Sequence, residues 1–105
     1  MTVALMSGPV HALVATFELH VPASRSLKSK RAALRPIVDG LAHRFKVSVA
    51  EVDHQDTWQR ATIAVALVSG SAKHLDEMYD SVTRFVDAAS DVEMIDREVT
   101  YTEMP

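Results

Sequence analysis

The chain of 105 residues contains no cysteine and only three glycines. Without cysteine, disulfide bonds, thiolate metal ligands and thiol nucleophiles are excluded. Three glycines are too few for a glycine-rich loop that cradles a phosphate, and no nucleophile elbow or HExxH pattern is present. Because no secretory signal is recognisable either, the missing cysteine favours a cytoplasmic protein.

Long apolar runs are also missing, since no window approaches the roughly 18 residues that a membrane helix needs. The composition, 48% hydrophobic and 24% charged, is that of one soluble domain. The net charge of −3 is unevenly distributed: residues 1–60 carry eight basic and five acidic side chains, and residues 61–105 carry three and nine. This asymmetry predicts one basic and one acidic surface, although chance placement of solvated charges explains it equally well.

Apolar periodicity predicts six elements in the order β-α-β-β-α-β. The predicted strands cover residues 11–21, 46–53, 60–69 and 92–101, and the predicted helices cover residues 26–44 and 71–89. Pro36 removes a backbone donor from the first helix, so we expect a kink there. We further expect a flexible N-terminal extension over residues 1–9, a single domain over residues 10–102, and fraying at Met104 and Pro105.

This order predicts an α+β, ferredoxin-like βαββαβ sandwich. Right-handed crossovers give an antiparallel sheet of order 4-1-3-2 with two helices on one face. The start of the first helix and the hairpin between the second and third strands then lie at the same end of the sheet. Two polar segments, residues 24–31 and 53–60, are therefore expected to be neighbours.

These two segments supply the candidate nucleic-acid or anion-binding residues, which are Arg25, Lys28, Lys30, Arg31, Trp58 and Arg60. Basic side chains at a helix start oppose the helix dipole, and a bound anion or RNA phosphate would offset that cost. Internal ion pairs, with Asp53 and Asp56 meeting Arg25 or Arg60, would offset it equally well. The single tryptophan at the hairpin is either an exposed partner contact or a cover over the end of the core.

Metal and acid–base chemistry receive little support. Asp53, His54 and Asp56 with His20 have the ligand chemistry of a divalent metal site, and His54–Asp56 or His20–Glu18 would make an acid–base pair. Such short clusters are common in loops, and the five histidines are scattered. We therefore predict no catalytic residue, no metal and no cofactor.

The sheet face opposite the helices is predicted to carry small, partly apolar residues, namely Val14, Thr16, Ala64, Ala66 and Val68. An RNA-recognition motif places stacking aromatic residues on the two central strands of this face, and none occurs here. A bare apolar face instead favours packing of one sheet against another in a homodimer.

Three blocks, RSLKSKR at 25–31, RFKVSVAEVD at 44–53 and HQDTWQRA at 54–61, resemble the YlxP-like family, domain-of-unknown-function family 503. The resemblance spans about residues 10–100. It implies a bacterial, ferredoxin-like protein without assigned catalytic residues, whose gene often lies among translation genes.

Three functional hypotheses follow. The first is a non-enzymatic accessory factor that binds RNA or ribosomal particles in translation or ribosome assembly. The second is a small domain that binds or converts an anionic ligand between the sheet end and the first helix. The third is a dimeric protein-interaction module.

Overall fold

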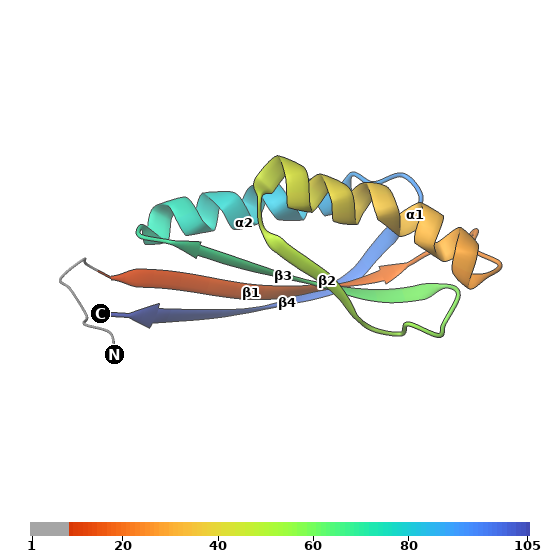
Figure 1. Cartoon of the computed structure of the whole chain (residues 1–105), viewed down its shortest axis with the longest axis horizontal. Coiled ribbons are helices and arrows are strands. Elements are labelled where there is room, and N and C mark those ends of the chain that lie inside the picture. The colour runs from red at the N-terminus through yellow and green to blue at the C-terminus, as the bar shows by residue number, and fades with distance from the viewer. Residues whose placement is uncertain (1–8) are drawn as a thin grey trace.

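The computed structural model describes residues 9–105 and contains four strands and two α-helices. The elements are β1 (Val10–His20), α1 (Leu27–Gly40), η1 (Leu41–Phe45), β2 (Ser48–Asp53), β3 (Arg60–Ser69), α2 (Ala72–Asp87) and β4 (Glu93–Met104). The sheet has the order β2-β3-β1-β4, with every neighbouring pair antiparallel. The helices lie together on one side of it (Figure 1). These findings confirm the predicted ferredoxin-like α+β fold, whereas residues 1–8 of the predicted extension lie outside the described part.

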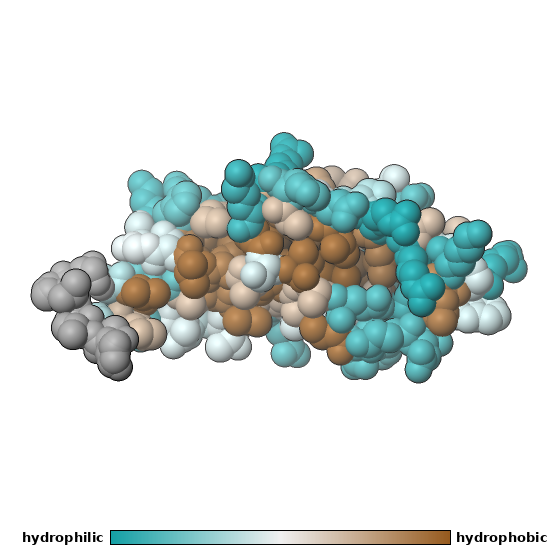
Figure 2. Space-filling view, viewed as in Figure 1, coloured by the Kyte–Doolittle hydropathy of each residue, from teal (hydrophilic) through white to brown (hydrophobic). Residues whose placement is uncertain are grey.

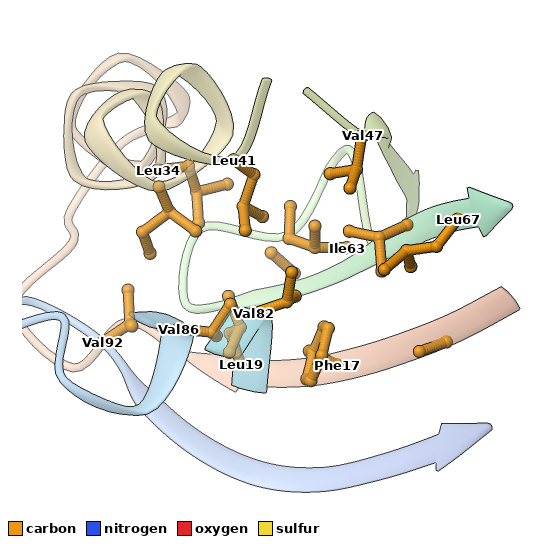
Figure 3. Packing of buried hydrophobic residues seen from close by; sticks show 14 of the residues in the cluster. Phe17, Leu19, Leu34, Leu41, Val47, Ile63, Leu67, Val82, Val86 and Val92 are labelled. Atoms are coloured by element: carbon orange, nitrogen blue, oxygen red, sulfur yellow. The ribbon is translucent and has the colours of Figure 1, made fainter. Parts of the chain in front are cut away.

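The core lies between the sheet and the two helices. In β1, the alternate residues Leu13, Ala15, Phe17 and Leu19 are buried, as the period of two in the sequence predicts. Buried side chains of α1, α2 and β3 meet them in one hydrophobic cluster (Figure 3). Each fully buried aliphatic or aromatic side chain contributes about 1.5–3 kcal/mol, so this cluster is the main source of stability.

Helix α1 begins at a capping box. The Ser26 hydroxyl accepts the Ser29 N–H at 3.0 Å, and the Ser29 hydroxyl accepts the Ser26 N–H at 3.1 Å. The helix continues through the exposed Pro36 to Gly40. After Gly40 the chain changes to one π-helical turn, η1, which ends at the left-handed residue Lys46 (φ 56°).

Two strand boundaries differ from the prediction by two or more residues, and the others agree to within one residue. β2 begins at Ser48 rather than residue 46, because the left-handed Lys46 turns the chain before the strand can start. β4 extends to Met104, which pairs with Val10 of β1. The prediction that Met104 frays is therefore wrong, since the first residue of β1 gives it a ladder partner.

The face of the sheet opposite the helices is open. Val14 is 50% exposed and Val68 is 69% exposed on this face. Another apolar region lies on the flank drawn in Figure 2, where hydrophobic side chains gather along the middle, below a hydrophilic row over the helices. The start of α1 and the β2–β3 hairpin contain the residues of the candidate site.

Candidate functional site

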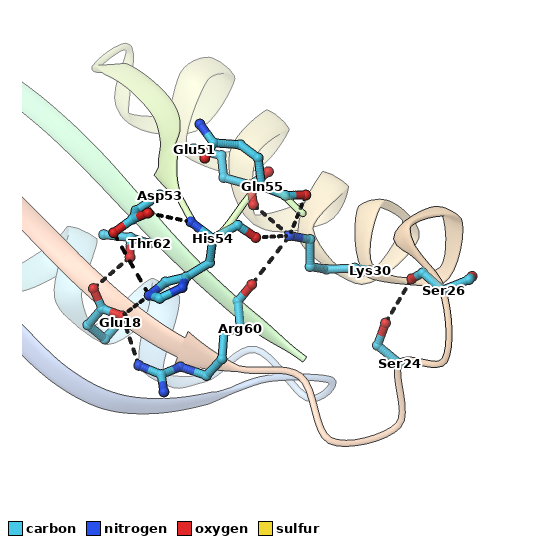
Figure 4. A network of polar contacts seen from close by, with 10 residues as sticks. All are labelled: Glu18, Ser24, Ser26, Lys30, Glu51, Asp53, His54, Gln55, Arg60 and Thr62. Atoms are coloured by element: carbon cyan, nitrogen blue, oxygen red, sulfur yellow. Dashed lines mark hydrogen bonds and ion pairs between the residues drawn. The ribbon is translucent and has the colours of Figure 1, made fainter. Parts of the chain in front are cut away.

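The start of α1 and the β2–β3 hairpin lie together at one end of the sheet, as the topology predicts (Figure 4). The Val21 N–H donates to the Gln59 carbonyl at 2.9 Å. The Gln59 side-chain amide donates to the carbonyls of Pro22 and Ser24 at 3.3 and 3.2 Å. The loop before α1 is thus held to the hairpin by one backbone hydrogen bond and by the side chain of Gln59.

Lys30 makes the central contact between the two segments, and its side chain is only 1% exposed. Its Nζ donates to Glu51 Oε2 at 2.9 Å and to the carbonyls of His54, Gln55 and Arg60 at 2.8, 3.4 and 3.3 Å. An ammonium has three protons to donate, and here all of them point at protein oxygens. The prediction that Lys30 contacts a phosphate is therefore wrong, because neither a donor nor accessible surface remains.

The contact from Lys30 also explains the shape of the hairpin. His54 has a left-handed backbone (φ 63°), an unfavourable conformation for a residue with a side chain. Its carbonyl accepts both the Lys30 ammonium and the Thr57 N–H, the latter at 3.0 Å. These two hydrogen bonds offset the local backbone cost and fix the turn that leads to Trp58.

Glu18 organises a second group on the open face. Its carboxylate accepts Thr62 Oγ1 at 2.6 Å and Arg60 Nη2 at 3.2 Å, and His54 Nε2 lies 3.7 Å from it. Arg60 is therefore paired internally, but with Glu18 rather than with Asp53 or Asp56.

The proposed acid–base and metal arrangements do not form as expected. His54 approaches Glu18 and Asp53 rather than Asp56, and His20 lies 3.7 Å from Glu93. Within residues 9–105, no three histidine or acidic side chains gather in a way that would hold a metal ion.

The remaining basic candidates face solvent. Exposed side chains are found at Arg25, Lys28 and Arg31. Arg35 is exposed as well, although it was not predicted as a site residue. Lys28, Arg31 and Arg35 follow one another at spacings of three and four, which places them on one side of α1. None of these four forms an ion pair with a carboxylate of residues 9–105. We call them the basic row.

Trp58 is 54% exposed at the tip of the hairpin, so its ring does not cover the core. It is adjacent in sequence to Gln59, whose side chain bonds the carbonyl of Ser24, directly before the basic row. The structure thus brings together an exposed aromatic ring and the start of a row of unpaired cations.

Together these observations define a small ferredoxin-like protein with a basic end and an internally braced hairpin. The chain belongs to the family described as "Protein of unknown function (DUF503)", whose model matches residues 12–99. It is 38% identical over 78 residues to the "Uncharacterized protein YlxP" of Bacillus subtilis (strain 168). That alignment covers 74% of this chain and 82% of the relative. The resemblance noted from the three sequence blocks is therefore confirmed.

One solved structure shares the fold, and another is similar to this chain. Rv0793 from Mycobacterium tuberculosis aligns with a TM-score of 0.51 and 18% identity, over 90% of this chain and 93% of its own. A dimeric protein of unknown function and ferredoxin-like fold from Bacteroides fragilis aligns with a TM-score of 0.49 and 6% identity, over 90% and 96%. At these identities the likeness concerns the fold alone. Across residues 9–105, none of the helices combines the length and the apolar character required to cross a membrane.

Proposed function

We propose that this protein is a non-enzymatic accessory factor of the cytoplasm that binds structured RNA, as in a ribosomal particle, through the basic row and Trp58. The observation that carries the proposal is that no carboxylate of residues 9–105 pairs with the basic row, whereas the nearby cations Lys30 and Arg60 are both paired. A cation that is not needed to stabilise the fold is available for a phosphate.

The geometry suits a nucleic-acid backbone. Arg35 lies seven positions after Lys28, so this part of the basic row extends about 10 Å along the helix, at 1.5 Å per residue. Phosphates beside the first turn would also meet the partial positive charge of the α1 N-terminus. That turn contains no acidic residue to repel them.

Trp58 adds a contact of a different kind. An exposed indole ring stacks on an unpaired base and contributes about 1–3 kcal/mol per base. The open sheet face lacks aromatic residues on β1 and β3 at the positions where an RNA-recognition motif stacks its bases. Binding at the end of the sandwich is therefore the better-supported mode for this chain.

The test is a titration of labelled ribosomal RNA at several salt concentrations. A triple variant, Arg25→Gln, Lys28→Gln and Arg31→Gln, should bind more weakly and lower the slope of log affinity against log salt by about 2 to 3, since each phosphate contact contributes about 0.7–0.9.

The matched control, Lys46→Gln, Lys73→Gln and Arg97→Gln, removes the same charge from exposed positions elsewhere and should retain most of the affinity. No binding at low salt, or equal losses in both triple variants, would overturn the proposal.

A second candidate function is self-association through the open sheet face. Apart from the exposed Val14 and Val68, this face has a shallow apolar groove of about 210 Å³. The groove is lined by Val14, Ser48, Val49, Ala50, Ala64, Val65 and Ala66. Small side chains let a second sheet approach closely, and burial of such a face would stabilise a dimer.

Sedimentation velocity over a range of concentrations tests this second function. Val68→Glu should yield monomers where the wild type is dimeric. Val99→Glu is the control, because Val99 is also exposed, at 50%, but pairs with Ala15, whose side chain faces the helices. A wild-type chain that is monomeric throughout the range would exclude the dimer.

A further inference from the structure

A groove between α1 and α2 takes no part in the functions proposed above. It consists of two hollows of about 400 and 360 Å³. The first is lined by Ala33, Pro36, Ile37, Arg44, Phe85, Ala88, Ala89, Ser90 and Asp91, and the second by Arg44, Phe45, Ser81, Arg84, Phe85 and Ala88. Because Arg44, Phe85 and Ala88 border both hollows, the two form one continuous surface, here called the α1–α2 groove.

The π-helical turn η1 builds the middle of this groove. The Arg44 guanidinium lies 5.7 Å from the ring centre of Phe45 and 5.8 Å from that of Phe85. The two rings meet edge to face at 5.5 Å. Gly40 allows Phe85 to lie there, since a Cβ at this position would be 2.3 Å from Phe85 Cζ. The guanidinium is thus held in place by two aromatic rings, which reduces the entropy that it loses on binding.

The groove carries two arginines, Arg44 and Arg84, and one acidic residue, Asp91. Arg84 donates one long hydrogen bond of 3.5 Å to Ser81 Oγ. Neither Arg84 nor Arg44 forms an ion pair with a carboxylate in the described part of the chain. A planar guanidinium without a partner fits a carboxylate through two parallel hydrogen bonds. Arg44 and Arg84 border the same hollow, and the apolar hollow lies next to it.

The apolar hollow distinguishes between possible partners. Its alanine, proline and isoleucine side chains offer no donors for the edge of a nucleobase, so that among the lining residues only Ser90 and Arg44 could donate, and Arg44 lies over the Phe85 ring. Asp91 lines this hollow, and not the one that Arg84 borders, so it would repel any anion placed here, whether a phosphate or a carboxylate. An aliphatic or aromatic side chain of a protein fills such a hollow without that penalty.

We propose that the α1–α2 groove binds an acidic, apolar peptide segment of a partner protein. A carboxylate of the segment pairs with Arg44 and Arg84, and a neighbouring apolar side chain enters the hollow between Pro36 and Ala88. This surface differs from the basic row, so the chain has one face for RNA and another for a protein partner.

Selection of phage-displayed random peptides on the full-length protein tests the proposal. Enriched peptides should combine Asp or Glu with a nearby Phe, Leu, Ile or Met. In anisotropy titrations with the enriched peptides, Arg44→Gln and Arg84→Gln should each weaken binding about tenfold, the effect of losing one charged hydrogen bond. Arg97→Gln is the matched control, because Arg97 also lies over an aromatic ring, that of Tyr79, outside the groove.

A further variant tests whether the groove itself, and not only its charge, is needed for peptide binding. Ala88→Gln fills the shared border of the two hollows while both arginines remain, and it should also abolish peptide binding. No enrichment, peptides without acidic residues, or equal binding by the groove variants and Arg97→Gln would each overturn the proposal. It would be overturned equally if the groove variants weakened ribosomal RNA binding as much as the basic-row variant does, because the groove would then belong to the RNA surface.

Discussion

Replacement of Lys30 by methionine tests how the site is held together. Methionine keeps most of the length of the side chain but removes the ammonium. The Glu51 carboxylate and the three carbonyls that accept from Lys30 would then face a methyl group. Loss of one partner of a buried ion pair costs about 3–5 kcal/mol. Because the Glu51 side chain is 24% exposed, water partly solvates it, and we expect the lower end, about 3 kcal/mol.

A loss of this size is a large share of the 5–15 kcal/mol that typically stabilises a domain. It should lower the melting temperature by about 15 °C in a domain of this length. Urea unfolding followed by far-ultraviolet circular dichroism measures the free energy, and the fluorescence of Trp58, the only tryptophan, reports on the hairpin.

Lys28→Met is the matched control, since Lys28 lies on the exposed side of the same helix, and its effect should stay within about 0.5 kcal/mol. The double variant Lys30→Met, Glu51→Gln should lose less than the sum of the single variants, because it leaves no unpaired charge. If Lys30→Met were as stable as Lys28→Met, the proposed role of Lys30 in bracing the hairpin would be refuted.

Two further outcomes follow from the packing and the charges. Gly40→Ala should destabilise the fold by about 1 kcal/mol despite the better helix propensity of alanine, because its Cβ would overlap Phe85. In a Phe85→Leu background the same change should become stabilising in thermal melts. Stabilisation in both backgrounds would contradict the packing of Phe85 against Gly40. Burial and the carboxylates of Glu103 and Asp76 raise the pKa of Tyr101 above its ordinary value of 10.0. Just above pH 10.0 the folded state therefore retains a proton that the unfolded chain releases. The free energy of unfolding should fall as the pH rises above 10.0. Ultraviolet absorbance of the phenolate in a Tyr79→Phe variant measures this ionisation, and its appearance at or below the ordinary pKa would contradict the prediction.

The fold was predictable because its determinants are local. Alternation in β1 and the helical spacing in α2 identify the buried faces directly, and right-handed crossovers leave one sheet order. The π-helical turn was not predictable from the periodicity, since Leu41 and Phe45 continue the helical spacing of the apolar residues before them.

The location of the site was predictable from the sequence, but its hydrogen bonds and ion pairs were not. Lys30 lies between Leu27 and Leu34 at helical spacing, so the periodicity marks it as buried, and only its charge argued for the surface. Glu18 meets Thr62 because the register of β1 against β3 places these residues opposite each other, and one sequence does not specify that register. Arg35 was identifiable from its spacing to Arg31.

The bonds from Lys30 to the hairpin end mainly on main-chain oxygens, which every amino acid possesses. At His54, Gln55 and Arg60, the path of the hairpin is therefore supported by a residue on another element that contacts main-chain atoms. His54 and Gln55 can be exchanged for other residues without loss of their carbonyl acceptors. This frees the tip of the hairpin to change its chemistry while it keeps its shape, so related chains can present different contact residues from the same scaffold.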